Sequence, residues 1–215
     1  MNILLYISNG LIITGFLWYL LLIFLNSHKK ISEDNGFDIT KDLISEYDSI
    51  NIIENTGKFT FYNIKRQVIK LSTRCYYAND LSYISIGILE AGISIIDKED
   101  NKYINILKKI FSNLKLLYIF PIISLIININ SYTVKDAEIG LILLSICVII
   151  SYLFINILND SLVWINKNIN KIKTISKDNR LSILNYLKNI ITINKLIFFG
   201  ELLIIIRLVS IMIER

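Results

Sequence analysis

Histidine, cysteine and proline are scarce in this chain of 215 residues. The single histidine, His28, excludes a zinc site built from two or three histidines. The two cysteines, Cys75 and Cys147, form no CxxC pair, so we expect two free thiols in a reducing compartment. With one proline, eight glycines and 53% hydrophobic residues, the chain is too apolar for an ordinary soluble domain, where roughly 45–50% is usual. The composition therefore predicts a membrane protein.

Four apolar stretches approach the roughly 20 residues that a helix needs to cross the hydrocarbon core. The first carries no charge and lacks the basic start and cleavage site of a signal peptide, so we expect a retained anchor. The second is the weakest, because Lys115 must snorkel and Pro121 would bend or restart the helix. The predicted spans are Ile3–Leu25, Leu114–Ile129, Ile139–Leu158 and Leu196–Ile213.

Basic residues predict the orientation, because short cytoplasmic flanks collect lysine and arginine. His28, Lys29 and Lys30 follow the first span, and seven basic residues but only two acidic ones lie between the third and fourth spans. Both segments should face the cytoplasm, with both termini and the turn Ser131–Glu138 outside. No aromatic stacking pattern accompanies the charge, so we expect a lipid bilayer as the partner and no nucleic acid.

A polar region over 27–113 should form a small cytoplasmic α+β region in an otherwise mainly α membrane protein. We expect a helix capped near Asp38 or Thr40 and ending near Tyr47, and then an extended piece. Two strands and a longer helix that carries Glu90 should follow. These last elements are predicted at Asn51–Ile53, Phe59–Tyr62, Gln67–Leu71 and Asp80–Asp97. The whole chain then divides into 1–26 (anchor), 27–113, 114–158 (two spans), 159–195 (basic cytoplasmic helical loop) and 196–215 (last span).

The order of these pieces, with the stretches "GKFT" and "VIKLSTRCYY", resembles the bacterial membrane-bound neutral zinc metallopeptidases of the YugP type. The resemblance implies an integral inner-membrane protein of a zinc-dependent endopeptidase family. The family's His-Glu-x-x-His motif falls on Leu89, Glu90, Ala91, Gly92 and Ile93. Its third zinc ligand, a glutamate, falls on Leu158. One position is also missing before Tyr62, where an Asp-His pair of the family becomes Phe61 alone.

The motif needs its residue types because two histidines four positions apart share one helix face and bind one zinc ion, while the glutamate polarises the bound water. Leu89, Ile93 and Leu158 have no lone pair to offer. We therefore expect no zinc, no other cofactor and no peptidase activity, with Glu90 as a vestigial general base. The resemblance then implies a pseudopeptidase, a membrane-bound binding or regulatory protein whose partner is a peptide or an active relative.

Two alternatives remain open. In the first, Glu90, Asp97 and Asp160 form a rebuilt oxygen-ligand site for a harder metal and support hydrolysis. In the second, the chain is a small channel or transporter, because Glu201 and Arg207 lie inside the last span and intramembrane charges are commonly functional. Arg207 has a plainer explanation in snorkelling toward the outer interface.

A packing prediction follows from the resemblance. If the three ligand positions have become an apolar contact, Leu89 and Ile93 should be buried and close to Leu158. Glu90, offset by one residue, should keep some solvent access.

Overall fold

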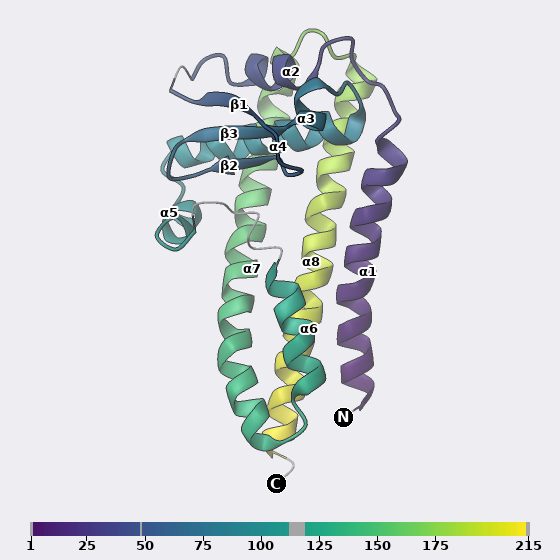
Figure 1. Cartoon of the computed structure of the whole chain (residues 1–215), viewed down its shortest axis with the longest axis vertical. Coiled ribbons are helices and arrows are strands. Elements are labelled where there is room, and N and C mark those ends of the chain that lie inside the picture. The colour runs from purple at the N-terminus through teal and green to yellow at the C-terminus, as the bar shows by residue number, and fades with distance from the viewer. Residues whose placement is uncertain (1, 48, 112–118, 214–215) are drawn as a thin grey trace. The chain divides into compact units, whose positions relative to one another are not determined.

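The computed structural model describes residues 2–47, 49–111 and 119–213 and is mainly helical (Figure 1). Three helices are long and apolar enough to cross a membrane, α1 (Asn2–Asn26), α7 (Val134–Asn168) and α8 (Lys177–Ile213). They contain three of the four predicted spans and support a membrane protein. At about 1.5 Å per residue, α7 and α8 are each longer than the roughly 30 Å hydrocarbon core. The segment 159–195, predicted as a basic helical loop, is mostly helix and includes a short 3₁₀ turn, η2 (Ile169–Lys171), between α7 and α8.

The fourth predicted span, Leu114–Ile129, is described only from residue 119 onward, so Lys115 lies outside the described residues. The helix there, α6 (Phe120–Asn130), carries Pro121 in its first turn, where a missing backbone N–H costs nothing. Its 11 residues rise about 16 Å, roughly half of the hydrocarbon core. The described part of this predicted span is thus too short to cross by itself.

The chain forms two compact units. The first comprises 1–20, 116–155 and 192–215, and the second comprises 21–115 and 156–191. In the first unit, helices approach closely at small residues, a common way to bring backbones together in membranes. Gly15 of α1 faces Ile197 of α8, and Gly200 of α8 faces Ile12 of α1. Gly140 of α7 faces Ile127 of α6.

The second unit contains a three-stranded sheet in the order β1-β3-β2, which contacts helix α4 through β2 and β3 (Figure 1). Strand β1 is parallel to β3, and β2 is antiparallel to it. The sequence-based prediction placed the extended piece and both strands to within two residues. The elements, in chain order, are α2 (Gly36–Leu43), β1 (Asn51–Asn55), β2 (Phe61–Asn63), β3 (Val68–Ser72), α3 (Thr73–Tyr77), α4 (Leu81–Lys98) and α5 (Lys102–Lys108).

The start of α2 differs from the prediction. Asn35 caps it by accepting a hydrogen bond from the backbone N–H of Asp38, so neither Asp38 nor Thr40 is the cap. The hydroxyl of Thr40 instead donates to the carbonyl of Gly36 inside the helix. An added Cβ at Gly36 would collide with the carbonyl oxygen of Cys75, so the first turn of α2 packs too tightly on α3 for any other residue.

Helix α4 begins as predicted. The Asp80 carboxylate accepts hydrogen bonds from the backbone N–H of Tyr83 and from the hydroxyl of Ser82. Almost every position from Leu81 to Asp97 is buried, so α4 is the central helix of the second unit.

Candidate functional site

Helix α4 approaches α7 near the predicted ligand positions. Leu89, Ile93 and Leu158 are all buried, as the sequence predicted for the first two. The two helices approach at Gly92, where an added Cβ would lie 2.8 Å from Cδ1 of Ile165. Leu89 is three positions from Gly92 and shares its face of α4, and Leu158 is seven positions from Ile165 and shares its face of α7. Besides Ile165, the Cβ atom of Ser161 lies at this approach. That Leu89 and Ile93 lie close to Leu158 stays a prediction.

Glu90 points to the sheet rather than to solvent. Its exposed fraction is only 5%, so the prediction that it keeps solvent access is wrong. Its Oε2 atom accepts a hydrogen bond of 2.9 Å from the backbone N–H of Tyr62 in β2. Strand β2 is an outer strand, and such a strand has backbone groups that no neighbouring strand pairs. Glu90 supplies an acceptor for one of them inside the core.

Asp97 lies two turns beyond Glu90 on the same side of α4 and binds the other end of the same tyrosine. The phenol of Tyr62 donates a hydrogen bond of 2.8 Å to Oδ2 of Asp97, and Nζ of Lys108 lies 3.3 Å from Oδ1. Burial and the Asp97 carboxylate both raise the pKa of Tyr62, so the phenol stays protonated. Glu90 and Asp97 thus hold Tyr62 at its backbone and at its side chain.

Asp160 has a separate partner, because its Oδ2 accepts a 2.8 Å hydrogen bond from Nδ2 of Asn101. Across 2–47, 49–111 and 119–213, no three histidine, cysteine or acidic side chains come together in a way that could hold a metal ion. The hypothesis that Glu90, Asp97 and Asp160 form one carboxylate metal site is therefore wrong. Each carboxylate is instead engaged by a donor of its own.

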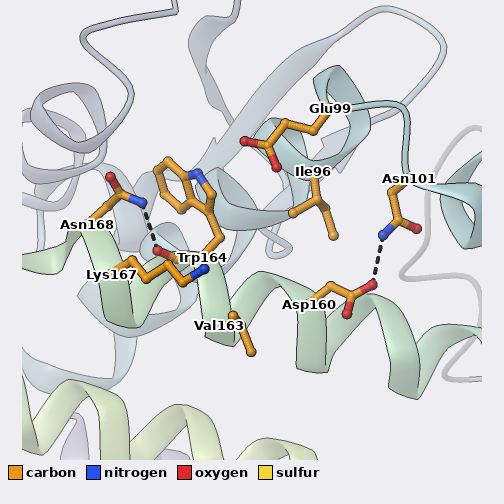
Figure 2. A pocket seen from close by; sticks show the side chains of 8 residues that line it. All are labelled: Ile96, Glu99, Asn101, Asp160, Val163, Trp164, Lys167 and Asn168. Carbon is orange, nitrogen blue, oxygen red and sulfur yellow. Dashed lines mark hydrogen bonds between the residues drawn. The ribbon is translucent and has the colours of Figure 1, made fainter.

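A pocket of about 470 Å³ opens beside the contact between α4 and α7 (Figure 2). Its volume is in the range of small-ligand sites. Ile96 and Glu99 reach it from the end of α4, opposite Asp160 and Trp164 on α7. Its lining combines two carboxylates, two amides, one ammonium group and three apolar side chains. The lining residues are Ile96, Glu99, Asn101, Asp160, Val163, Trp164, Lys167 and Asn168.

The first unit contains two buried charged residues, which lie in the apolar stretch Leu196–Ile213. Arg207 is only 2% exposed, so protein groups surround it, and the prediction that it snorkels toward the outer interface stays a prediction. Its guanidinium donates to the backbone carbonyls of Asn128 (2.6 Å) and Ser131 (3.0 Å) and to the side chain of Asn128 (2.8 Å). These carbonyls belong to the end of α6 and would otherwise lack donors. Asn128 in turn donates to Ser8 of α1.

Glu201 contacts the middle of α6. It is fully buried, and its Oε1 atom accepts a hydrogen bond of 3.1 Å from Ser124. Helix α8 therefore places an acid beside the middle of α6 and a base at its C-terminus, where the helix dipole favours positive charge. Because each group has partners on α6, the two residues need no direct pair.

Comparison of the chain with protein-family models, curated proteins and solved structures finds no match. The resemblance to the zinc metallopeptidases remains a prediction from the sequence.

Proposed function

We propose that this chain is a catalytically inactive relative of the YugP-type zinc metallopeptidases. In this proposal it is a membrane-bound binding or regulatory protein, with its second unit on the cytoplasmic side. A peptide or an active relative is the partner.

The observation that carries the proposal is the packing around Glu90. In a working site of this type, the glutamate faces a water bound to zinc, and two histidines flank it. Here its Oε2 atom binds the backbone of Tyr62, and Leu89 and Ile93 on the flanking positions are buried. Aliphatic side chains offer no lone pair to a metal. Glu90 binds the backbone of the core, and apolar side chains occupy the flanking positions. Both observations favour a structural role over catalysis.

The pocket beside this contact is the proposed binding site. Its indole and aliphatic side chains provide apolar area, while Glu99 and Lys167 offer charged groups that can orient a polar main chain. Val163 is 56% exposed, so the pocket is accessible at its α7 side. This mixture suits a short peptide segment better than a purely apolar ligand.

Restoring the ligands tests the proposed ancestry. We expect the purified wild-type protein in detergent to carry no stoichiometric zinc, and the triple variant Leu89→His, Ile93→His, Leu158→Glu to bind about one zinc ion per chain. Metal content after dialysis is the measurement. Stoichiometric zinc in the wild type that is lost in Glu90→Gln would overturn the proposal.

A matched control keeps one histidine and the glutamate but withholds the second histidine. Leu89→His with Leu158→Glu, with Ile93 unchanged, supplies too few ligands for a zinc site, so zinc should not be retained. If the triple variant folds, as judged by circular dichroism, and binds no more zinc than this control, the three positions do not converge as the family requires.

Site-specific photo-crosslinking tests the pocket. A benzoylphenylalanine at Val163 should form adducts with a bound peptide partner in cells, and Glu99→Lys should reduce their yield. The same probe at Leu181, which is equally exposed (58%) and lies outside the pocket, is the control. Equal adduct yields from both positions would contradict a pocket-specific partner.

A small channel or transporter is the second candidate, and one observation favours it. The Oε2 atom of Glu201 is buried and has no hydrogen-bond partner among the described residues. Loss of ion or proton flux in proteoliposomes on Glu201→Gln, with folding intact, would favour this candidate over the first.

A further inference from the structure

We propose that Glu201 is a proton-binding site inside the helical bundle, where its carboxyl group takes up and releases a proton within an apolar stretch of the chain. The inference concerns the first unit only. It does not depend on whether the second unit derives from a peptidase.

The position of the carboxyl group carries the proposal. Glu201 is fully buried between three helices, with Ser124 of α6 donating to its Oε1 atom and with Cys147 and Ser151 of α7 close to it. Its Oε2 atom has no hydrogen-bond partner among the described residues. One oxygen is thus held by the protein, and the other is left for a ligand.

No ion pair within the described part of the chain neutralises this carboxyl group. Arg207, six positions further along α8, directs both terminal nitrogens of its guanidinium to carbonyls of α6. The facing groups on α6 and α7 are the two serine hydroxyls and the Cys147 thiol, and α1 contributes the apolar Ile12 beside Gly200. An isolated carboxylate in such surroundings is costly, and the usual outcome is that it takes up a proton.

The surrounding hydroxyl groups suit both protonation states. A serine hydroxyl can donate to a carboxylate and can also accept from a carboxylic acid, so Ser124 and Ser151 can rotate as the proton arrives or leaves. The proton is the ligand that these oxygen-poor surroundings favour, because a metal cation would require more oxygen ligands.

An apolar carbodiimide, N,N′-dicyclohexylcarbodiimide, provides the test. It adds to a protonated carboxyl group in an apolar site and leaves an N-acylurea on the glutamate with no leaving group. We expect peptide mass spectrometry of the treated wild-type protein in detergent to find the adduct on Glu201 at about pH 6 and several-fold less at about pH 9. Glu33, whose side chain is 91% exposed, is the control and should stay unmodified.

Two variants and a second measurement complete the test. Glu201→Gln should lose the adduct and the infrared C=O stretch of a buried protonated carboxyl group, and it keeps the shape of the side chain. Ser124→Ala removes a donor that stabilises the anion, so its adduct should persist to higher pH.

The proposal is overturned if the infrared band of the wild type equals that of Glu201→Gln at every pH, whether or not the carbodiimide reaches the site. It is also overturned if sodium or lithium chloride suppresses the adduct at constant pH, since the site would then bind a small monovalent cation.

Discussion

Replacing Glu90 by alanine tests whether this residue supports the core. The change removes the acceptor for the backbone N–H of Tyr62, which is buried. A hydrogen bond to a charged group contributes about 1.5–3 kcal/mol, and a lone buried donor costs about as much. We therefore expect Glu90→Ala to lower the free energy of unfolding of the second unit by about 2–3 kcal/mol. Glu90→Gln keeps an acceptor oxygen and should cost less than about 1 kcal/mol.

The fluorescence of Trp164 reports this unit specifically once Trp18, the other tryptophan, is replaced by phenylalanine. Urea titration in detergent with linear extrapolation gives the free energies. Glu33→Ala, on the surface, should change stability by less than about 0.5 kcal/mol. The structural role is refuted if Glu90→Ala is as stable as the surface control, or if glutamine costs as much as alanine.

Three further changes test other contacts. Tyr62→Phe should destabilise the second unit by about 1.5–3 kcal/mol at neutral pH, because Asp97 loses a donor. The folded state raises the pKa of this phenol, whereas the unfolded chain releases the proton at about pH 10. The free energy of unfolding of the wild type should therefore fall above about pH 10, and that of Tyr62→Phe should fall less. Urea titrations at several pH values measure both. Gly36→Ala should unfold the second unit at lower urea than wild type, whereas Gly10→Ala, which meets no atom within 4 Å, should not. Arg207→Leu should lower the free energy of unfolding by about 1–3 kcal/mol for each carbonyl at the end of α6 that loses its donor. Unfolding in mixed micelles of rising SDS content measures this change. An unchanged unfolding midpoint would contradict the capping role.

Features with local causes could be predicted from the sequence. The three long apolar helices follow from the length of the apolar runs, and α4 is capped at Asp80 because an acidic cap directly precedes a helical pattern. The cap of α2 was misplaced by three to five residues, since Asn35, Asp38 and Thr40 are all good caps and the tight packing of Gly36 on Cys75 decides between them.

Features with distant causes could not be predicted. The partner of Glu90 is 28 positions away on an outer strand, and nothing near either residue indicates that pairing. Arg207 is 79 positions from the carbonyl of Asn128 to which it donates, so snorkelling was the plainer prediction from the span alone. The pocket likewise depends on two helices whose residues are about sixty positions apart. In each case the sequence shows the residue type, but only the tertiary structure brings its partner close to it.

The dependence of α6 on α8 has a consequence for biogenesis. The arginine that satisfies the carbonyls at the end of α6 is synthesised after both α6 and α7. The C-terminal end of α6 therefore gains these hydrogen bonds only after the last helix has been made.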